Sequence, residues 1–148
     1  MKIYLGSDHN GFHLKNELFA YLSKHNYDVE DIGDKVYDPA DDFPQFAGLA
    51  VTKVLGSEDP DSRAILICGG GQGMAMAANR FKGIRAAVIW DIEEAKESRR
   101  DNDSNVLALP ARILKEDTAN RIVEAWLNTP FEPVSRYVRR NAQLDEIV

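Results

Sequence analysis

The fold is decided by the stretch Arg63-Ala64-Ile65-Leu66-Ile67-Cys68-Gly69-Gly70-Gly71-Gln72-Gly73-Met74. Its first half is continuously apolar, which is typical of a parallel strand covered on both faces. The only cysteine of the chain ends this strand, and a glycine-rich turn then leads into a helix of small residues over 73–79. A strand, turn and helix in this order predict an α/β domain, in which ligands bind at the carboxyl ends of the strands.

Strand and helix patterns alternate on both sides of this unit. Apolar runs predict the other strands at 3–5, 27–32, 85–90 and 105–109. Helical spacing predicts helices from 10 or 11 to 25, over 43–55, 91–100 and 117–127, and from about 134 onward. In the helix over 43–55, the inward residues are predicted to be Phe46, Leu49, Ala50 and Val54. The alternation predicts a three-layer α/β/α Rossmann-like fold with a five-stranded parallel sheet.

The carboxyl-terminal helix, about 134–148, is predicted to be a dimerisation element. It follows two prolines, and its apolar residues are Val134, Tyr137, Val138, Leu144, Ile147 and Val148. These are too many apolar side chains for a free tail, so we expect the helix to pack on a second subunit. No repeat or linker interrupts the chain, and we therefore expect a single domain over 1–148.

Composition limits the classes of partner. The 148 residues carry a formal net charge of −6 and a pI of about 5.0, which argues against binding to nucleic acid or to an anionic membrane. No apolar run is long enough to span a membrane, and we expect no signal peptide before the first strand. One cysteine allows no intramolecular disulfide and fits a reducing compartment. We therefore expect a cytoplasmic protein.

The glycine-rich turn is the strongest candidate for chemistry. Four glycines in the five positions 69–73 let backbone N–H groups converge, because glycine tolerates positive φ. Before a helix, such amides bind an anion or a developing oxyanion, although a tight turn alone would also need glycine. Cys68 could be a small core residue, but the helix amino end beside it favours a reactive thiolate. The turn matches neither a Walker loop nor a dinucleotide fingerprint.

Other polar residues are expected at the same edge of the sheet. Asp8 and His9 follow the first strand, while Asp101 and Asn102 precede the fifth strand and Arg112 follows it. His9 could instead be a loop histidine without a role. The acidic run over 38–42 predicts a solvated loop. Three histidines and one cysteine do not cluster as zinc ligands, so no metal site is predicted.

The last helix also carries a candidate phosphate clamp. Arg136 and Arg140 are four residues apart and so share a helix face. Guanidinium groups bind phosphate through paired hydrogen bonds, which predicts a phosphate site. A solvated helix face is the alternative.

Several motifs in the same order resemble those of the B-type ribose-5-phosphate isomerases and the related galactose-6-phosphate isomerases. They are Gly6-Ser7-Asp8-His9-Asn10-Gly11-Phe12 with Leu14-Lys15, Asp42-Phe43-Pro44, Ile67-Cys68-Gly69-Gly70-Gly71-Gln72-Gly73-Met74 with Ala77-Ala78-Asn79, Gly83-Ile84-Arg85-Ala86-Ala87, and Asn102, Asn105-Val106-Leu107-Ala108 and Arg112. The resemblance covers nearly the whole chain. It implies an aldose–ketose isomerase, by default of ribose 5-phosphate and ribulose 5-phosphate, that uses an enediolate intermediate and no cofactor or metal.

The resemblance also implies roles for individual residues. Cys68 would be the general base, and the amides of Gly69, Gly70, Gly71, Gln72 and Gly73 would hold the enediolate. Asp8, His9, Asn102 and Arg112 would contact the substrate, and His9, Arg136, Tyr137 and Arg140 would bind its phosphate. It further implies a homodimer or homotetramer in which the arginines reach into the neighbouring subunit's site.

Three positions depart from the family pattern. Asp101 stands where the family usually has a histidine that opens the sugar ring, Gly70 where it often has Thr or Ser, and Tyr137 where it often has His. These departures leave two alternatives open: an isomerase of a different pentose or hexose phosphate, and a phosphosugar-binding protein without isomerase activity. A nucleotide-binding domain is disfavoured, because no acidic residue stands at the expected distance beyond a fingerprint.

Overall fold

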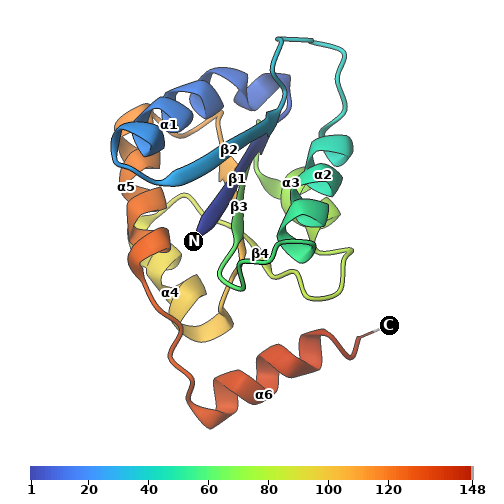
Figure 1. Ribbon diagram of the computed structural model, residues 1–148, viewed down its shortest axis with the longest axis vertical. Helices are drawn as coiled ribbons and strands as arrows, with labels where there is room; N and C mark the ends of the chain where they lie inside the picture. The colour runs from blue at the N-terminus through green and yellow to red at the C-terminus, as the bar shows by residue number, and fades with distance from the viewer. Residues whose placement is uncertain (148) are drawn as a thin grey trace.

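The computed structural model describes residues 1–147 and is built on one five-stranded parallel sheet (Figure 1). The strands are β1 (Lys2–Ser7), β2 (Asp28–Gly33), β3 (Arg63–Cys68), β4 (Ala86–Val88) and β5 (Val106–Pro110). Their order across the sheet is β2-β1-β3-β5-β4, with every neighbouring pair parallel. The predicted fold class is confirmed, and β3 has the predicted bounds at the centre of the sheet. The strand predicted over 85–90 is shorter, because β4 is an edge strand paired only with β5.

Helices cover both faces of the sheet (Figure 1). One face carries α1 (Phe12–Lys24), α4 (Ile92–Asn102) and α5 (Glu116–Asn128), and the other carries α2 (Phe43–Leu55) and α3 (Gln72–Ala78). A short 3-10 helix, η1 (His9–Gly11), leads into α1, and α6 (Ser135–Leu144) is the last helix. This arrangement confirms the three layers.

The central strand β3 divides the core into two parts. All six of its residues are buried, with Ile65 and Ile67 packed on one face and Leu66 and Cys68 on the other. Side chains alternate across a strand, so a strand covered on both faces must be apolar throughout. The helices on each face pack their apolar side chains against these strand residues.

The prediction that Leu49 faces inward is wrong, because it is half exposed on the outer side of α2. Ala47 and Val51 are buried in that helix.

The last helix lies apart from the sheet, at the edge where the parallel strands begin (Figure 1). It lies against the end of α4, where Asn141 Nδ2 donates a hydrogen bond of 3.2 Å to the Asp101 carbonyl oxygen. Asn141 is the one buried residue of α6, while Val134, Val138, Leu144 and Ile147 stay exposed. Val148 lies outside the described residues. Packing of this helix on a second subunit stays a prediction.

A search of residues 1–147 for membrane spans finds no helix with the length and apolar character that a bilayer crossing needs.

Candidate active site

Cys68 lies at the carboxyl end of the central strand and contacts the start of the glycine-rich turn. The Gly71 amide donates a hydrogen bond of 3.2 Å to Cys68 Sγ, and the thiol is buried. Gly71 has φ +75°, which L-residues with side chains rarely adopt. This left-handed residue turns the chain back toward the sulfur and starts α3. Of the four glycines of the turn, Gly71 alone has positive φ.

Side chains lie directly on the backbone of the other three glycines of the turn. An added Cβ would be 2.6 Å from Arg112 Nη2 at Gly69, and 2.8 Å from the Phe43 ring at Gly73. At Gly70 it would be 2.5 Å from Oε1 of Gln72. The turn is therefore packed under a guanidinium, a phenyl ring and a carboxamide.

Arg112 belongs to this edge of the sheet, as predicted. It follows β5, and its amide donates to the Gly69 carbonyl at 2.9 Å, while the Ala111 amide donates to the Cys68 carbonyl at 2.9 Å. These two bonds fix the backbone after β5 against the backbone after β3. They bring the Arg112 guanidinium over the backbone of Gly69, the residue that follows Cys68.

Asp8 and His9 reach the same edge from the end of β1. The Asp8 amide donates to the Ile67 carbonyl at 3.3 Å, one residue before Cys68. The Asp8 carboxylate accepts hydrogen bonds from the amides of Asn10 and Gly11 and so caps η1. Burial raises the pKa of Asp8, and those amides and His9 oppose the rise.

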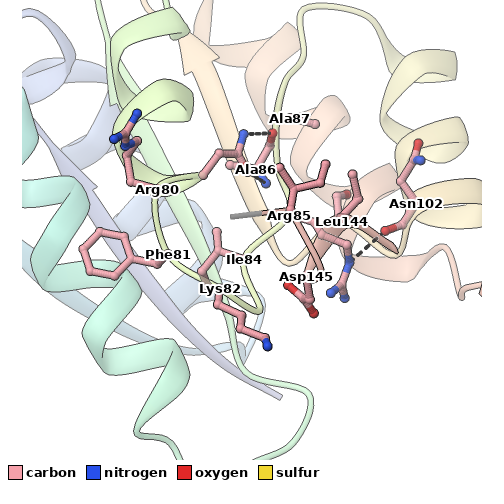
Figure 2. A pocket seen from close by; sticks show the side chains of 13 residues that line it. Arg80, Phe81, Lys82, Ile84, Arg85, Ala86, Ala87, Asn102, Leu144 and Asp145 are labelled. Atoms are coloured by element: carbon pink, nitrogen blue, oxygen red, sulfur yellow. Dashed lines mark hydrogen bonds between the residues drawn. The ribbon is translucent and has the colours of Figure 1, made fainter. Parts of the chain in front are cut away.

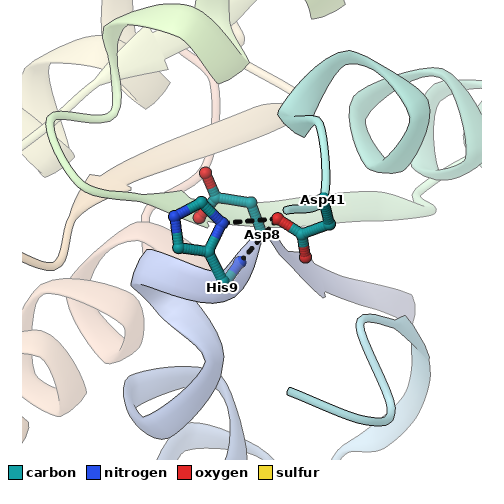
Figure 3. Close-up of side chains that lie close together, drawn as sticks. All are labelled: Asp8, His9 and Asp41. Carbon is teal, nitrogen blue, oxygen red and sulfur yellow. Dashed lines mark hydrogen bonds and ion pairs between the residues drawn. The ribbon is translucent and has the colours of Figure 1, made fainter. Parts of the chain in front are cut away.

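His9 is held by a carboxylate that sequence reasoning missed. Its Nδ1 lies 2.6 Å from Asp41 Oδ1, which also accepts the His9 amide at 3.1 Å (Figure 3). The predicted solvated loop over 38–42 is confirmed except at Asp41, whose side chain is 4% exposed. The hydrogen bond to Asp41 raises the pKa of His9. Burial acts to raise the pKa of Asp41, but the hydrogen bonds from His9 outweigh it and the pKa is lowered. No periodic pattern marks Asp41, because it lies in an irregular loop.

Asp8, His9 and Asp41 each offer an atom of the kind that binds metals, within 4.8 Å of one another. Two ligands of a tetrahedral metal ion lie about 3.4 Å apart, given bond lengths near 2.1 Å. The 2.6 Å between His9 Nδ1 and Asp41 Oδ1 is that of a hydrogen bond, and two amides already occupy Asp8 Oδ1. The geometry of these three residues therefore favours hydrogen bonding over metal ligation.

Asp101 and Asn102 do not lie with Cys68 in this chain, and the prediction that they do is wrong. They end α4, which returns the chain to the amino edge of the sheet before β5 begins. The Asn102 carbonyl accepts a hydrogen bond of 2.9 Å from Arg85 Nε. Asn102 lines a pocket of about 620 Å³ there, between Arg85 and the end of α6 (Figure 2).

The candidate phosphate ligands on α6 lie at this same amino edge. Arg136 Nη2 donates to the Tyr137 hydroxyl at 3.1 Å, and its guanidinium lies 4.6 Å from the centroid of the Tyr137 ring. Arg140 is exposed. One chain thus holds two separate groups of candidate residues. Cys68, the turn, Arg112, Asp8 and His9 form one group, and Asp101, Asn102, Arg136, Tyr137 and Arg140 form the other.

Residues 3–144 match the family described as Ribose/Galactose Isomerase. The chain belongs to the ribose/galactose isomerase family. Ribose-5-phosphate isomerase B of Mycolicibacterium paratuberculosis is 37% identical over 140 residues, which make up 95% of this chain and 87% of that protein. The resemblance inferred from the motifs is therefore confirmed.

Solved structures of ribose/galactose isomerases have the same fold. Ribose 5-phosphate isomerase of Thermotoga maritima superposes with a TM-score of 0.93 and 38% identity, covering 99% of this chain and 98% of that one. Ribose-5-phosphate isomerase B of Mycoplasma genitalium, solved with bound ribulose-5-phosphate, gives a TM-score of 0.91 and 35% identity, covering 98% and 94%. The Rossmann-like fold expected for the family is thus present along nearly the entire chain.

Proposed function

We propose that this protein is an aldose–ketose isomerase that interconverts ribose 5-phosphate and ribulose 5-phosphate. The observation that carries the proposal is the buried Cys68 thiol, which accepts a hydrogen bond from the Gly71 amide and precedes Gly69, on whose backbone the Arg112 guanidinium lies. Membership of the ribose/galactose isomerase family and the ribulose-5-phosphate bound to the Mycoplasma genitalium relative support it. Residues 1–148 would form a single isomerase domain, and the single cysteine fits a cytoplasmic protein.

In the proposed reaction, Cys68 moves one proton between adjacent carbons. The thiolate removes the proton from C2 of the open-chain aldose, and the electron pair forms the C1–C2 double bond of an enediolate. The thiol then returns this proton to C1, while the hydroxyl proton passes from O2 to O1. No atom is gained or lost. The amides of the glycine-rich turn and Arg112 stabilise the negative oxygens, because fixed donors in a buried site act most strongly where charge develops.

The second group of residues would act in a partner's site. Arg136, Arg140, Asp101 and Asn102 gather at the amino edge of the sheet, away from their own Cys68. The exposed apolar residues of α6 need a surface to cover them. In a homodimer, two arginines four residues apart on one helix would bind the substrate's phosphate through paired hydrogen bonds. Larger assemblies, such as a tetramer, would keep this arrangement.

Asp101 favours two alternatives to isomerisation of ribose 5-phosphate. An ionised aspartate is a poor acid near pH 7, so it is ill suited to open a furanose ring. A different pentose or hexose phosphate, or phosphosugar binding without turnover, would agree with this residue.

The test is ketose formation from a panel of pentose and hexose phosphates. Ribose 5-phosphate should be turned over, and the Cys68→Ala variant should not turn it over. An absence of turnover with every sugar phosphate, from correctly folded protein, would refute the proposal. The Asp101→His variant provides a second test. A higher isomerisation rate in this variant would indicate that ring opening limits the natural enzyme. Calorimetric binding of a sugar phosphate without turnover, in both the natural protein and the variant, would favour the binding function.

A further inference from the structure

Three side chains form a hydrogen-bonded series that leads from the loop before α2 into the candidate site. His9 contacts Asp41 through Nδ1, and Asp41 in turn neighbours Asp34. A carboxylate can only accept hydrogen bonds, so the 2.6 Å contact places a proton on His9 Nδ1. The opposite nitrogen, Nε2, points away from Asp41 (Figure 3). His9 is the exposed end of the series, with 26% of its side chain accessible compared with 4% for Asp41.

The inner end of the series contains two oxygens that lack donors. Oδ2 of Asp34 and Oδ2 of Asp41 are both buried, and neither has a hydrogen-bond partner among the described residues. A buried oxygen without a donor is costly, and two adjacent ionised carboxylates repel each other. One proton between them removes both problems. Burial and the hydrogen bond with Asp41 raise the pKa of Asp34, whereas the pKa of Asp41 is lowered, so Asp34 takes up a proton more readily than Asp41.

We propose that Asp41 is a positioning residue that orients His9 with Nε2 toward the substrate's phosphate, and that protonated Asp34 donates a hydrogen bond to Asp41. The role of His9 toward phosphate rests on the proposed function. The role of Asp41 toward His9 rests on the contacts alone. The hydrogen bond to Asp41 favours the imidazolium form of His9, which can donate from Nε2 to a phosphate oxygen, and a charged donor to phosphate is stronger than a neutral one.

Several other groups act on His9 and must be kept constant in the test. Asp8 and Asp38 are further negative charges close enough to affect it, and Tyr37 contacts its ring edge-on at 6.5 Å between centroids. His13 stacks on the other side of Tyr37. Asp38→Asn is therefore the matched control: it removes the same charge from the same loop, and its amide oxygen can still cap the Ala40 amide.

The first experiment is an NMR titration of the His9 imidazole in the full-length protein. In Asp41→Asn the pKa of His9 should fall, and in Asp38→Asn it should change less. The KM for ribose 5-phosphate should rise about tenfold in Asp41→Asn with kcat changed less than about threefold, as expected when binding common to substrate and transition state is lost. An unchanged His9 titration in Asp41→Asn, or a lower kcat at constant KM, would overturn the proposal.

The second experiment tests Asp34 and does not depend on how Asp41→Asn folds. Infrared spectroscopy of the natural protein during an acid titration should show the carbonyl stretch of a carboxyl group that takes up its proton at higher pH than an ordinary aspartate, and Asp34→Asn should lose this step while Asp38→Asn keeps it. The side-chain amide introduced by Asp34→Asn can still donate to Asp41, so this variant should keep the natural His9 titration. The same step in Asp34→Asn would overturn the assignment of the proton. Neither spectroscopic measurement needs turnover. A result that contradicts the contacts among Asp34, Asp41 and His9 can therefore be distinguished from a result that contradicts the isomerase function.

Discussion

The Gly71 amide donates a hydrogen bond to Cys68 Sγ across 3.2 Å, from a residue with left-handed backbone. The sulfur thus has a fixed donor beside it, of the kind that stabilises negative charge on a thiolate. The same hydrogen bond holds the turn against the thiol, so the proposed base and the proposed enediolate-binding amides are fixed relative to each other. This relationship defines what substitutions at position 68 should do.

Cys68→Ser and Cys68→Ala should both abolish isomerisation while leaving the protein folded. A serine hydroxyl is far less acidic than a thiol and supplies almost no anion near neutrality, and loss of a general base typically costs about 10²- to 10⁴-fold in rate. The side chain removed is small, so the loss of core packing is modest. The assay is ketose formation, with circular dichroism as the control for folding. A rate within tenfold of the natural enzyme in Cys68→Ala would contradict the role of Cys68.

Gly73→Ala and Gly48→Ala should change stability in opposite directions. A Cβ at Gly73 would be 2.8 to 3.1 Å from atoms of the Phe43 ring, so the alanine should destabilise the fold by about 1–3 kcal/mol and displace the turn. Gly48 lies inside α2, with nothing within 4 Å of its added Cβ, so alanine should stabilise by about 0.5–1 kcal/mol through helix propensity. Urea unfolding of both variants measures this. An unfolding midpoint of Gly73→Ala equal to that of the natural protein would show that the turn tolerates a side chain at position 73.

The sequence predicted those parts of the fold that burial determines. The bounds of β3 and of α2 follow from apolar patterns that packing enforces. Cys68, the turn and Arg112 could be placed together because the loops that follow parallel strands meet at one edge. The roles expected for the other site residues come from the resemblance to the family motifs.

Other features could not be predicted from local patterns. The position of Asp101 and Asn102 is an exception, because they precede the predicted fifth strand and a residue before a parallel strand lies at the amino edge. Asp41 was missed because its burial depends on a contact with His9, 32 residues earlier. Contacts across such separations leave no periodic trace in a single sequence.

Tyr21 should ionise at unusually high pH. The hydrogen bond from its hydroxyl to Glu124, followed by burial, raises its pKa to about 12. Because the folded-state pKa exceeds the unfolded value near 10, this hydrogen bond stabilises the fold below about pH 10 and the contribution is lost as the pH rises through about 12. Ultraviolet absorbance of tyrosinate during an alkaline titration measures it. Tyr21→Phe should remove the ionisation step at the highest pH, and Glu124→Gln should move that step to lower pH. Identical titration curves for Glu124→Gln and the natural protein would contradict the assignment of this step to Tyr21.

Mixing two inactive variants should restore activity if Arg140 acts in the site of a partner. Cys68→Ala and Arg140→Ala should each be nearly inactive as homodimers, the first without its base and the second with a weakened phosphate site. In a hybrid dimer, one site combines the intact Cys68 of one subunit with the intact Arg140 of the other. Random subunit exchange makes half of the dimers hybrids with one intact site of two, so about a quarter of natural activity should return.

The control mixes Cys68→Ala with the double variant Cys68→Ala/Arg140→Ala, which has no intact base in any combination and should stay inactive. Subunit exchange itself is verified by native mass spectrometry of the mixture. If exchange is complete and no activity returns, Arg140 serves the site of its own chain or none. That result would be difficult to reconcile with the position of α6 at the amino edge of the sheet, because the helix would have to leave its contact with Asp101 to reach Cys68.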